Sequence, residues 1–523
     1  MRDGNPGRTF VLGLDGIPWS LLSTWVEEGH LPNFARISRE GASGPLESTM
    51  PPTTALAWPS IATGVGPDKH GIHFFGKLND DYTTRPYTSN DINSPTIWEM
   101  LSPSVVGNVP MTYPAQEIDG TIVSGMMTPR FDERAVHPQE AYEDIRKRIP
   151  EYEIGLSWSD YGDEREAFLR DLQSLFESRR ELMRYLMEID DWELFFFVYT
   201  EPDRLQHLIW DEEVILDHYE QLDDVLGEIL EYIEGTETNL FVVSDHGFGP
   251  INKFVCVNSI LESNGFLQRM ENRNIRKFLD SVGISKKLVE NLLKRLQLDE
   301  FVYRMLSPSL FARIAEQVPG DSVLHDIDFT QTTAFCYGPG YIYIHDQNRF
   351  KNGMVSPPDI EKTKEEIMME LNDFSEKMDD GKLRITDGDD VFPSDKNGPD
   401  LIITAIGEYE VKARLSSNPI IDSETEVANH RSEGIVLAWG NEISSTKIRD
   451  AKVFDIAPTI LHGMGRPVPE RTDGRVLDVF DPSSRPGTTE VTQKNYESRG
   501  THREFDEDFS EVEDRLRGLG YVE

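Results

Sequence analysis

Short apolar runs that end abruptly in polar or acidic residues are the feature of this sequence that most constrains its fold. Three such runs, each almost continuously apolar, cover residues 9–14, 194–199 and 239–243. A strand that is buried on both faces of a parallel sheet has this composition. Longer stretches of mixed polarity with the character of helices lie between the runs, at residues 164–188 and 211–234. The alternation predicts an α/β fold with a mainly parallel central sheet and helices on both of its faces.

Two later segments depart from this alternation. Residues 266–325 are rich in helix-forming residues and carry a cluster of Lys and Arg, so we expect a helical cap inserted into the main domain. The end of the chain is acidic, and we expect a helix near 505–517. We therefore predict one large domain over residues 1–480, which includes the cap, followed by an acidic C-terminal tail over residues 481–523.

The balance of charges limits the partners of the chain. Its 523 residues include 52 Lys and Arg against 93 Asp and Glu, which gives a formal net charge of −41. This charge argues against binding of long nucleic acids and against docking on anionic lipid, because both surfaces require basic residues. Lys is scarce, at 18 residues against 34 Arg. An excess of carboxylates with few Lys predicts a halophilic protein, since concentrated salt screens the repulsion among its charges.

Cysteine usage and hydropathy indicate the compartment. Cys256 and Cys336 are the two cysteines, which is too few for a disulfide framework, and they form no Cys-x-x-Cys motif. The first residues lack the length and the cleavage site of a signal peptide. No run approaches the roughly 18 apolar residues of a membrane span. We predict a soluble cytoplasmic protein, and its oligomeric state stays open.

Acidic residues at the ends of the three runs indicate a metal site. Asp15, Asp203 and the pair Asp245–His246 follow the expected strands, and the carboxyl ends of parallel strands meet at one edge of a sheet. His207 lies four residues after Asp203, which places both side chains on one face of a helical turn. Carboxylate oxygens with imidazole nitrogens suit zinc or a similar divalent ion. A single Asp after a strand is more often a turn residue, so the prediction depends on their joint placement.

Two adjacent threonines precede an expected helix and provide candidate nucleophiles. Thr53 and Thr54 follow Pro51-Pro52, and a hydroxyl at a helix start is most often an N-cap. The free N–H groups and the dipole at such a helix start also favour a phosphate group. A hydroxyl there that touches a metal could ionise near neutral pH and attack phosphorus.

At these positions the sequence resembles the alkaline phosphatase superfamily and, within it, the type I phosphodiesterase/nucleotide pyrophosphatase branch, with the acidic composition of a haloarchaeal member. The resemblance spans residues 9–480 and implies an alkaline-phosphatase-like fold and phosphodiester hydrolysis. It rests on an ordered set of motifs: Asp15, Pro51-Pro52-Thr53-Thr54, Lys69-His70-Gly71-Ile72, Glu201-Pro202-Asp203-x-x-x-His207, Ser244-Asp245-His246-Gly247 and a late His430.

The resemblance also implies the roles of individual residues. It assigns Thr54 as the nucleophile, because the threonine of the family stands nine residues before the position held here by Thr63. Two divalent ions are implied, zinc first and manganese as an alternative, together with a phospho-threonine intermediate. The ligands of one ion would be Asp15, Thr54, Asp245 and His246, and the ligands of the other would be Asp203, His207 and His430.

One departure from the family pattern bears on the substrate. Phe75 stands where the nucleotide pyrophosphatases have an asparagine that helps to hold a phosphate oxygen. Another donor would have to replace that asparagine. The backbone N–H groups of Thr54 and Ala55 are the first candidates, and the imidazole of His73 is the weaker one. We therefore predict a small phosphate-ester substrate, with phosphodiester cleavage as the main activity. The alternatives are a phosphomonoesterase, a phosphonate hydrolase, a phosphoryl transferase of the same superfamily, or a non-catalytic metal-binding protein.

Overall fold

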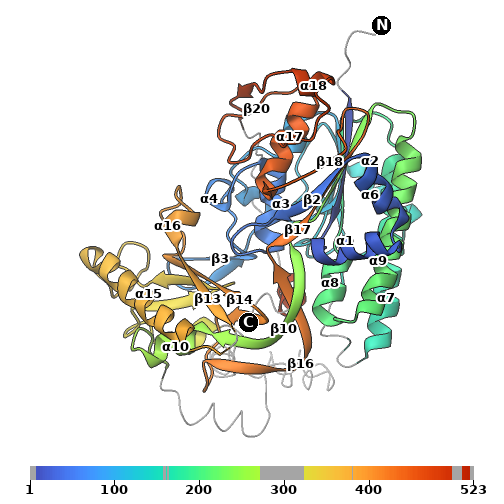
Figure 1. The fold of residues 1–523 in the computed structure, drawn as a ribbon. Helices are drawn as coiled ribbons and strands as arrows, with labels where there is room; N and C mark the ends of the chain where they lie inside the picture. Colours follow the sequence, from blue (N-terminus) through green and yellow to red (C-terminus); the bar gives the residue numbers. More distant parts are fainter. Residues whose placement is uncertain are drawn as a thin grey trace, which may run out of the picture.

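A ten-stranded sheet forms the centre of the molecule (Figure 1). The computed structural model describes residues 7–156, 161, 164–270, 323–379, 381–497 and 509–518. The order of the strands is β18-β2-β17-β9-β1-β8-β5-β6-β7, and β19 pairs with β2 outside this path. Their bounds are β1 Arg8–Leu14, β2 Ala42–Glu47, β5 Ser104–Val109, β6 Gly120–Ser124, β7 Val136–His137, β8 Leu194–Tyr199, β9 Thr238–Val243, β17 Glu433–Trp439, β18 Thr446–Lys447 and β19 Ala451–Lys452.

Five neighbouring strands at the middle of this sheet are parallel. Strand β1 pairs in parallel with β8 on one side and β9 on the other, so that Val11 lies beside Phe196 and Phe241. Strands β5 and β6 continue the parallel array beyond β8. Strand β17 runs antiparallel to β9 and to β2. The three apolar runs of the sequence thus become adjacent parallel strands, and the predicted mainly parallel central sheet is confirmed.

Helices cover both faces of the sheet because alternate residues of each strand point to opposite sides. Phe10, Leu12 and Leu14 of β1 belong to one apolar cluster, and Val11 belongs to another. The first cluster includes residues of α1 Trp19–Glu28, α2 Pro32–Glu40, α6 Gln139–Arg148, α7 Arg165–Met187 and α9 Glu212–Ile233. The second cluster includes residues of α3 Thr54–Thr63, α5 Ile97–Met100 and α17 Ile456–Gly463. The predicted helices at 164–188 and 211–234 correspond to α7 and α9.

A second lobe, built on residues 247–270 and 323–431, lies beside the main sheet at the lower left of Figure 1. It holds a three-stranded sheet of order β15-β10-β16 and a four-stranded sheet of order β11-β12-β14-β13, with a shared apolar core. Its elements are β10 Gly247–Cys256, α10 Val257–Ser263, β11 Ala334–Tyr337, β12 Tyr341–Ile344, α15 Ile360–Glu376, β13 Lys382–Asp387, α16 Gly388–Val391, β14 Leu401–Ile406, β15 Tyr409–Lys412 and β16 Ile420–Arg431.

Smaller elements complete the described chain. They are α4 Pro67–His70, β3 Gly76–Leu78, β4 Thr84–Pro86, α8 Glu201–Leu208, β20 Val468–Pro469, α18 Arg485–Thr488, β21 Gln493–Lys494 and α19 Ser510–Gly518. Helix α19 lies close to the helix that the sequence predicts near the C-terminus. Most of the predicted cap, residues 271–322, lies outside the described residues. The predicted boundary between the main domain and the tail at 480/481 stays a prediction.

Candidate metal centre

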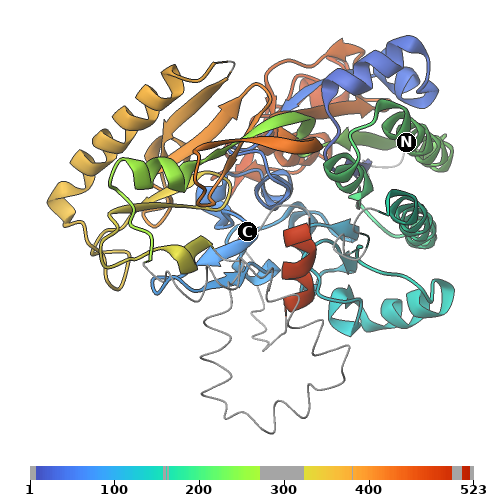
Figure 2. The same ribbon diagram turned by 90° about the horizontal axis from the view of Figure 1, so that it is seen from below.

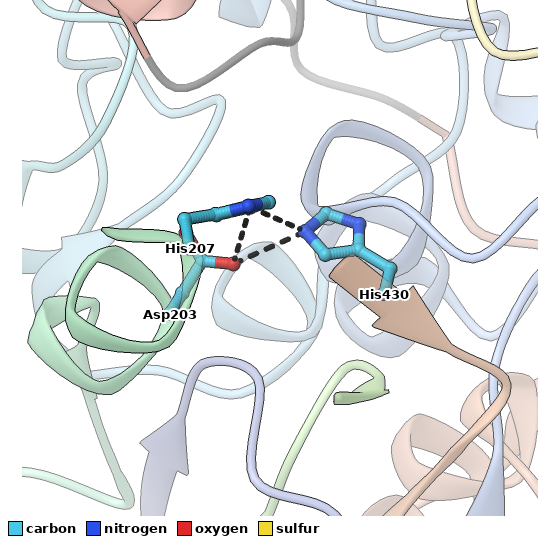
Figure 3. Close-up of side chains that lie close together, drawn as sticks. All are labelled: Asp203, His207 and His430. Atoms are coloured by element: carbon cyan, nitrogen blue, oxygen red, sulfur yellow. Dashed lines mark hydrogen bonds and ion pairs between the residues drawn. The ribbon is translucent and has the colours of Figure 1, made fainter. Parts of the chain in front are cut away.

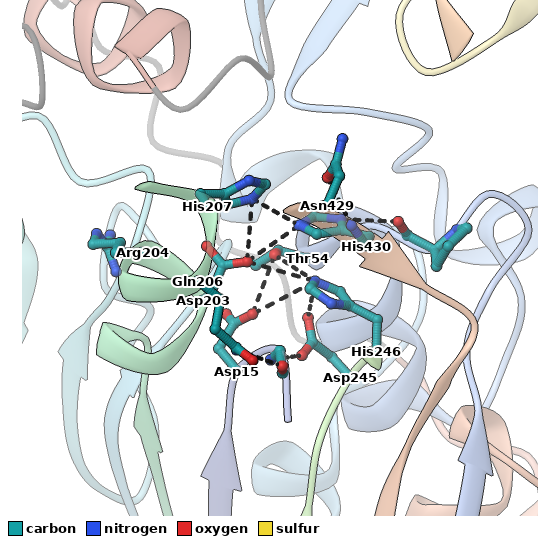
Figure 4. A network of polar contacts seen from close by, with 12 residues as sticks. Asp15, Thr54, Asp203, Arg204, Gln206, His207, Asp245, His246, Asn429 and His430 are labelled. Carbon is teal, nitrogen blue, oxygen red and sulfur yellow. Dashed lines mark hydrogen bonds and ion pairs between the residues drawn. The ribbon is translucent and has the colours of Figure 1, made fainter. Parts of the chain in front are cut away.

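Five of the seven predicted site residues belong to segments that follow parallel strands and meet at the carboxyl edge of the main sheet. Asp15 directly follows β1, and Asp245 and His246 directly follow β9. Asp203 and His207 lie on the short helix α8, which begins two residues after the end of β8. The parallel pairing of β9, β1 and β8 brings these segments together, as Figure 4 shows. The residues Asp15, Asp203, Asp245 and His246 are at most 2% exposed.

Thr54 places its hydroxyl among these groups. It is the first residue of α3, and its Oγ1 lies 3.4 Å from Oδ1 of Asp15 and 3.2 Å from Nε2 of His246 (Figure 4). Thr53 precedes the helix and is its N-cap residue, but its buried hydroxyl makes no hydrogen bond. The two threonines that the sequence leaves open as candidates are therefore distinguished by their surroundings, and only the Thr54 hydroxyl lies against the candidate metal ligands.

The first group of candidate ligands consists of Asp15, Asp245 and His246. Nε2 of His246 lies 3.6 Å from Oδ1 of Asp15 and 3.2 Å from Oδ2 of Asp245. Two donors fix the carboxylates: the backbone N–H of Gly16 donates to Oδ1 of Asp245 at 3.2 Å, and the indole N–H of Trp58 donates to Oδ2 of Asp15 at 3.1 Å. Each carboxylate therefore has a fixed orientation.

The second group consists of Asp203, His207 and His430 (Figure 3). Nε2 of His430 lies 3.1 Å from Oδ1 of Asp203 and 3.0 Å from Nε2 of His207, and the distance from His207 to Asp203 is 3.4 Å. His430 comes from strand β16 of the second lobe, where it faces Phe248 of β10 in the antiparallel pairing. This group therefore joins a helix of the main domain to a strand of the second lobe.

The hydrogen bonds of two imidazoles show that both groups suit a cation. Nδ1 of His246 lies 3.1 Å from the carbonyl oxygen of Gly247, and Nδ1 of His430 lies 3.0 Å from that of Pro52. A carbonyl oxygen only accepts, so each Nδ1 must carry the proton and each Nε2 presents a lone pair. These lone pairs face the oxygens of Asp15, Asp203 and Asp245. A divalent ion at each group would satisfy lone pairs that cannot bond to one another.

Burial and neighbouring charges shift the pKa values of the candidate ligands as expected for carboxylates and imidazoles gathered in a buried site. Burial, followed by the charges of nearby carboxylates, raises the pKa values of Asp15 and Asp245 well above their ordinary values. Burial alone would also disfavour ionised Asp203, but the adjacent imidazoles of His207 and His430 outweigh it and hold its pKa well below its usual range. Burial lowers the pKa values of His246 and His430, which favours the neutral form of both imidazoles. Neutral imidazole is the form that binds a metal.

Several supporting residues escape prediction from the sequence. Trp58 lies four residues after Thr54, and this helical spacing was the available signal for its approach to Asp15. Arg179 of α7 and Glu201 of α8 form a fully buried ion pair at 3.3 Å, with no exposed side-chain surface on either residue. Nothing in their sequence separation predicts this pair, because it depends on how α7 packs against α8.

Phe75 and the candidate phosphate donors have different surroundings. Phe75 is fully buried in an apolar cluster that also contains Ala55 and Leu56 of α3. Nε2 of His73 lies 2.8 Å from Oδ2 of Asp395, so this imidazole is engaged with the second lobe. The backbone N–H groups of Thr54 and Ala55 are at the start of α3, where a helix provides no partner of its own.

Solved structures of other proteins share the fold of this chain. The fold resembles that of two solved ectonucleotide pyrophosphatase/phosphodiesterase 5 structures, at 12% sequence identity in each case. The murine protein has a TM-score of 0.51, with 91% of this chain and 100% of that chain covered. The human protein has a TM-score of 0.50, with 90% of this chain and 100% of that chain covered. The fold is therefore similar to that of these two ectonucleotide pyrophosphatase/phosphodiesterase structures over most of the chain.

The family follows from the sequence itself. Residues 9–412 match the profile of the type I phosphodiesterase / nucleotide pyrophosphatase family. The chain belongs to this family and is a hydrolase of phosphate ester bonds. A search of curated proteins found no match. Among the described residues, every helix is too short or too polar to span a lipid bilayer.

Proposed function

We propose that this chain is a two-metal phosphodiesterase that uses Thr54 as its nucleophile. The single observation that carries the proposal is the placement of the Thr54 hydroxyl at the start of α3, 3.4 Å from Asp15 and 3.2 Å from His246, beside two groups of inward-facing lone pairs. A further structure from the murine relative, with a TM-score of 0.50, is described as an inactive threonine-to-alanine variant in complex with AMP. That description supports a threonine as the reactive residue.

The ligand sets suggest which ions are bound. Asp15, Asp245 and His246 would hold one ion together with the Thr54 oxygen, and Asp203, His207 and His430 would hold the other. Mixed imidazole and carboxylate donors favour zinc, with manganese as the alternative. Bound together, the two ions would supply Lewis-acid stabilisation of the charge that develops on the attacking and leaving oxygens.

The residues of the chain define the course of the reaction. The Thr54 hydroxyl donates toward Oδ1 of Asp15, which would take its proton because a carboxylate has lone pairs in addition to the one that holds an ion, and the Thr54 oxygen forms a bond to phosphorus. The bond from phosphorus to the leaving oxygen breaks in line with this attack. Water then cleaves the resulting phospho-threonine, which returns the Thr54 hydroxyl. The N–H groups of Thr54 and Ala55 would donate to a phosphoryl oxygen, in place of the amide that Phe75 replaces.

The test is the hydrolysis of an aryl phosphodiester by the full chain with added Zn²⁺ or Mn²⁺, at low and at high salt, because the acidic composition predicts a halophilic protein. Thr54→Ala should reduce kcat by at least about a thousandfold while two ions remain bound. Thr53→Ala is the matched control and should retain activity within about threefold, since its hydroxyl has no partner. Unchanged activity of Thr54→Ala would refute the assignment of Thr54 as the nucleophile.

A panel of substrates separates the proposal from its alternatives. Faster turnover of a phosphate monoester or a phosphonate than of any diester would replace the diesterase by the corresponding activity of the same superfamily. Binding of two ions without turnover of any of these esters would identify a non-catalytic metal-binding protein. A cytoplasmic location stays a prediction.

A further inference from the structure

The C-terminal helix α19 lies at the same edge of the main sheet as the candidate metal centre, but over different strands. Nη2 of Arg515 donates to the carbonyl oxygens of Thr128 and Pro129, at 2.8 and 2.5 Å. These two residues belong to the loop that leaves the carboxyl end of β6. In Figure 2, α19 is the red helix beside the loops near the centre of the molecule. The metal ligands follow β9, β1 and β8, whereas α19 is bound to the loop after β6, farther along the same edge.

Apolar side chains dock this helix. Val512 and Leu516 are only 2% and 3% exposed, and they share an apolar cluster with Phe75 and with Ala55 and Leu56 of α3. The ring of Phe509, just before the helix, makes an edge contact with Tyr113 at a centroid separation of 6.3 Å. Tyr113 belongs to the loop that leaves the carboxyl end of β5. The helix is therefore packed as part of the core and covers the loops after both β5 and β6.

The apolar cluster that holds α19 extends to the second lobe, because its member Phe74 makes an edge contact with the ring of Tyr337 at a centroid separation of 6.3 Å. Burial, with a further contribution from the Glu513 carboxylate, raises the pKa of the Tyr337 hydroxyl. Tyr337 lies on β11, and its hydroxyl is 3.4 Å from the carbonyl oxygen of Gly76. Helix α19 thus stands between loops of the main domain and the edge of the second lobe.

The docked helix borders the reacting groups on two sides. Ala55 directly follows Thr54, and Leu208 directly follows His207. Ala55 is a member of the cluster that contains Val512 and Leu516, and Leu208 packs against it together with Phe509. In open α/β sheets a ligand lies in the crevice beyond the carboxyl ends of the strands. Helix α19 lies at the part of that crevice next to the ends of β5 and β6, which follow β8 in the order of the strands.

We propose that α19 is a specificity-determining element, which fills the part of the crevice beyond β8 and thereby limits the group that a diester substrate retains on phosphorus to a small one. The proposal rests on the phosphodiesterase function proposed above. Phe75 belongs to the same apolar cluster as Val512 and Leu516, so its ring helps to hold α19 next to Ala55 and Leu56 of α3.

Two diesters with the same leaving group test the proposal in the full chain. One is methyl p-nitrophenyl phosphate, and the other is the p-nitrophenyl ester of a nucleoside monophosphate. Leu516→Asp places a charge in the apolar cluster and should undock α19, so the ratio of kcat/KM for the large over the small diester should rise by about tenfold or more. Leu516→Met keeps the volume and should leave the ratio unchanged.

Arg515→Ala provides a milder variant that removes the hydrogen bonds to Thr128 and Pro129 but keeps the apolar contacts of Val512 and Leu516, and it should raise the ratio by a smaller factor. An equal change of kcat/KM for both diesters in folded, metal-loaded Leu516→Asp and Arg515→Ala would overturn the proposal. Binding of methyl phosphate and of AMP to the metal-loaded variants gives the same size ratio without turnover. A wild-type chain that cleaves neither diester therefore defeats the proposed function, while the binding ratio still decides the role of α19.

Discussion

The two groups of candidate metal ligands are built in different ways. Asp15, Asp245 and His246 follow two adjacent parallel strands of one sheet, and donors of the main domain fix their carboxylates. Asp203 and His207 lie on a helix, and their partner His430 comes from a strand of the second lobe. The ligands of the first group all follow strands of the main sheet. The second group exists only when the two lobes are correctly placed, so it should respond to changes that the first group tolerates.

Removal of one ligand from each group gives the largest expected effect. Asp245→Ala and His430→Ala should each lower the bound Zn²⁺ from two ions to one and reduce kcat by at least about a hundredfold. Measurement of metal content after dialysis, together with steady-state rates, checks this. His430→Ala should still retain the ion beside Thr54. Loss of both ions from both variants would show that the groups are not independent.

The buried pair of Arg179 and Glu201 tests the support of the second group alone. Arg179→Met leaves the Glu201 carboxylate buried without its partner, and this should lower the free energy of unfolding by about 3–5 kcal/mol. Glu201 begins α8, so affinity for the second ion should also fall, by about 10–100-fold. Denaturant unfolding and metal titration provide the two readouts.

Arg184→Met on the same helix is the matched control for this prediction. Arg184 is 51% exposed and pairs with Glu228, so its loss should cost no more than about 1 kcal/mol. The double variant Arg179→Met, Glu201→Met should recover much of the lost stability, because an apolar pair needs no compensating charge. A loss of affinity at the first ion in Arg179→Met would contradict the separation of the two groups.

Acid should lower the free energy of unfolding through His70, a buried residue that supports the helix of Thr54. His70 lies 3.1 Å from the Ser60 hydroxyl of α3, the helix that carries Thr54, and burial lowers its pKa to about 3. The unfolded chain, with an ordinary histidine pKa of about 6.5, takes up the proton first, so this contribution is constant above that pH and falls as the pH drops below it. At about pH 5 the loss should be about 2 kcal/mol. Unfolding of metal-free protein should show a smaller pH dependence in His70→Gln, and an identical dependence would argue against this prediction.

Trp58→Phe gives the smallest expected effect and the most local one. It removes the indole N–H that holds Oδ2 of Asp15 but keeps an aromatic ring in the core. Affinity for the first ion should fall by about tenfold, and affinity for the second should not change. Trp98→Phe, at another tryptophan of the same apolar cluster, is the control and should leave both affinities unchanged. Metal titration with a chromophoric chelator measures both.

The same difference explains how much of the site could be predicted from the sequence. The apolar runs locate β1, β8 and β9, and parallel pairing then implies that Asp15, Asp203 and Asp245 converge. His430 has no such local signal, because its place depends on the antiparallel register of two strands distant in sequence. It could be proposed only through the family resemblance. The Arg179–Glu201 pair and the docking of α19 depend on packing between helices and loops, which leaves no periodic trace in the sequence.

The pairing of β10 with β16 has a consequence for the reaction itself. His246 directly precedes β10, His430 lies on β16, and their rings stack with centroids 3.6 Å apart. Neighbouring strands are held about 4.8 Å apart by their backbone hydrogen bonds. The backbone hydrogen bonds between β10 and β16 therefore fix the distance between His246 and His430, which are one ligand from each group. Exchange of one metal for another would alter individual bond lengths, yet the span offered to a phosphoryl group would remain that set by the backbone.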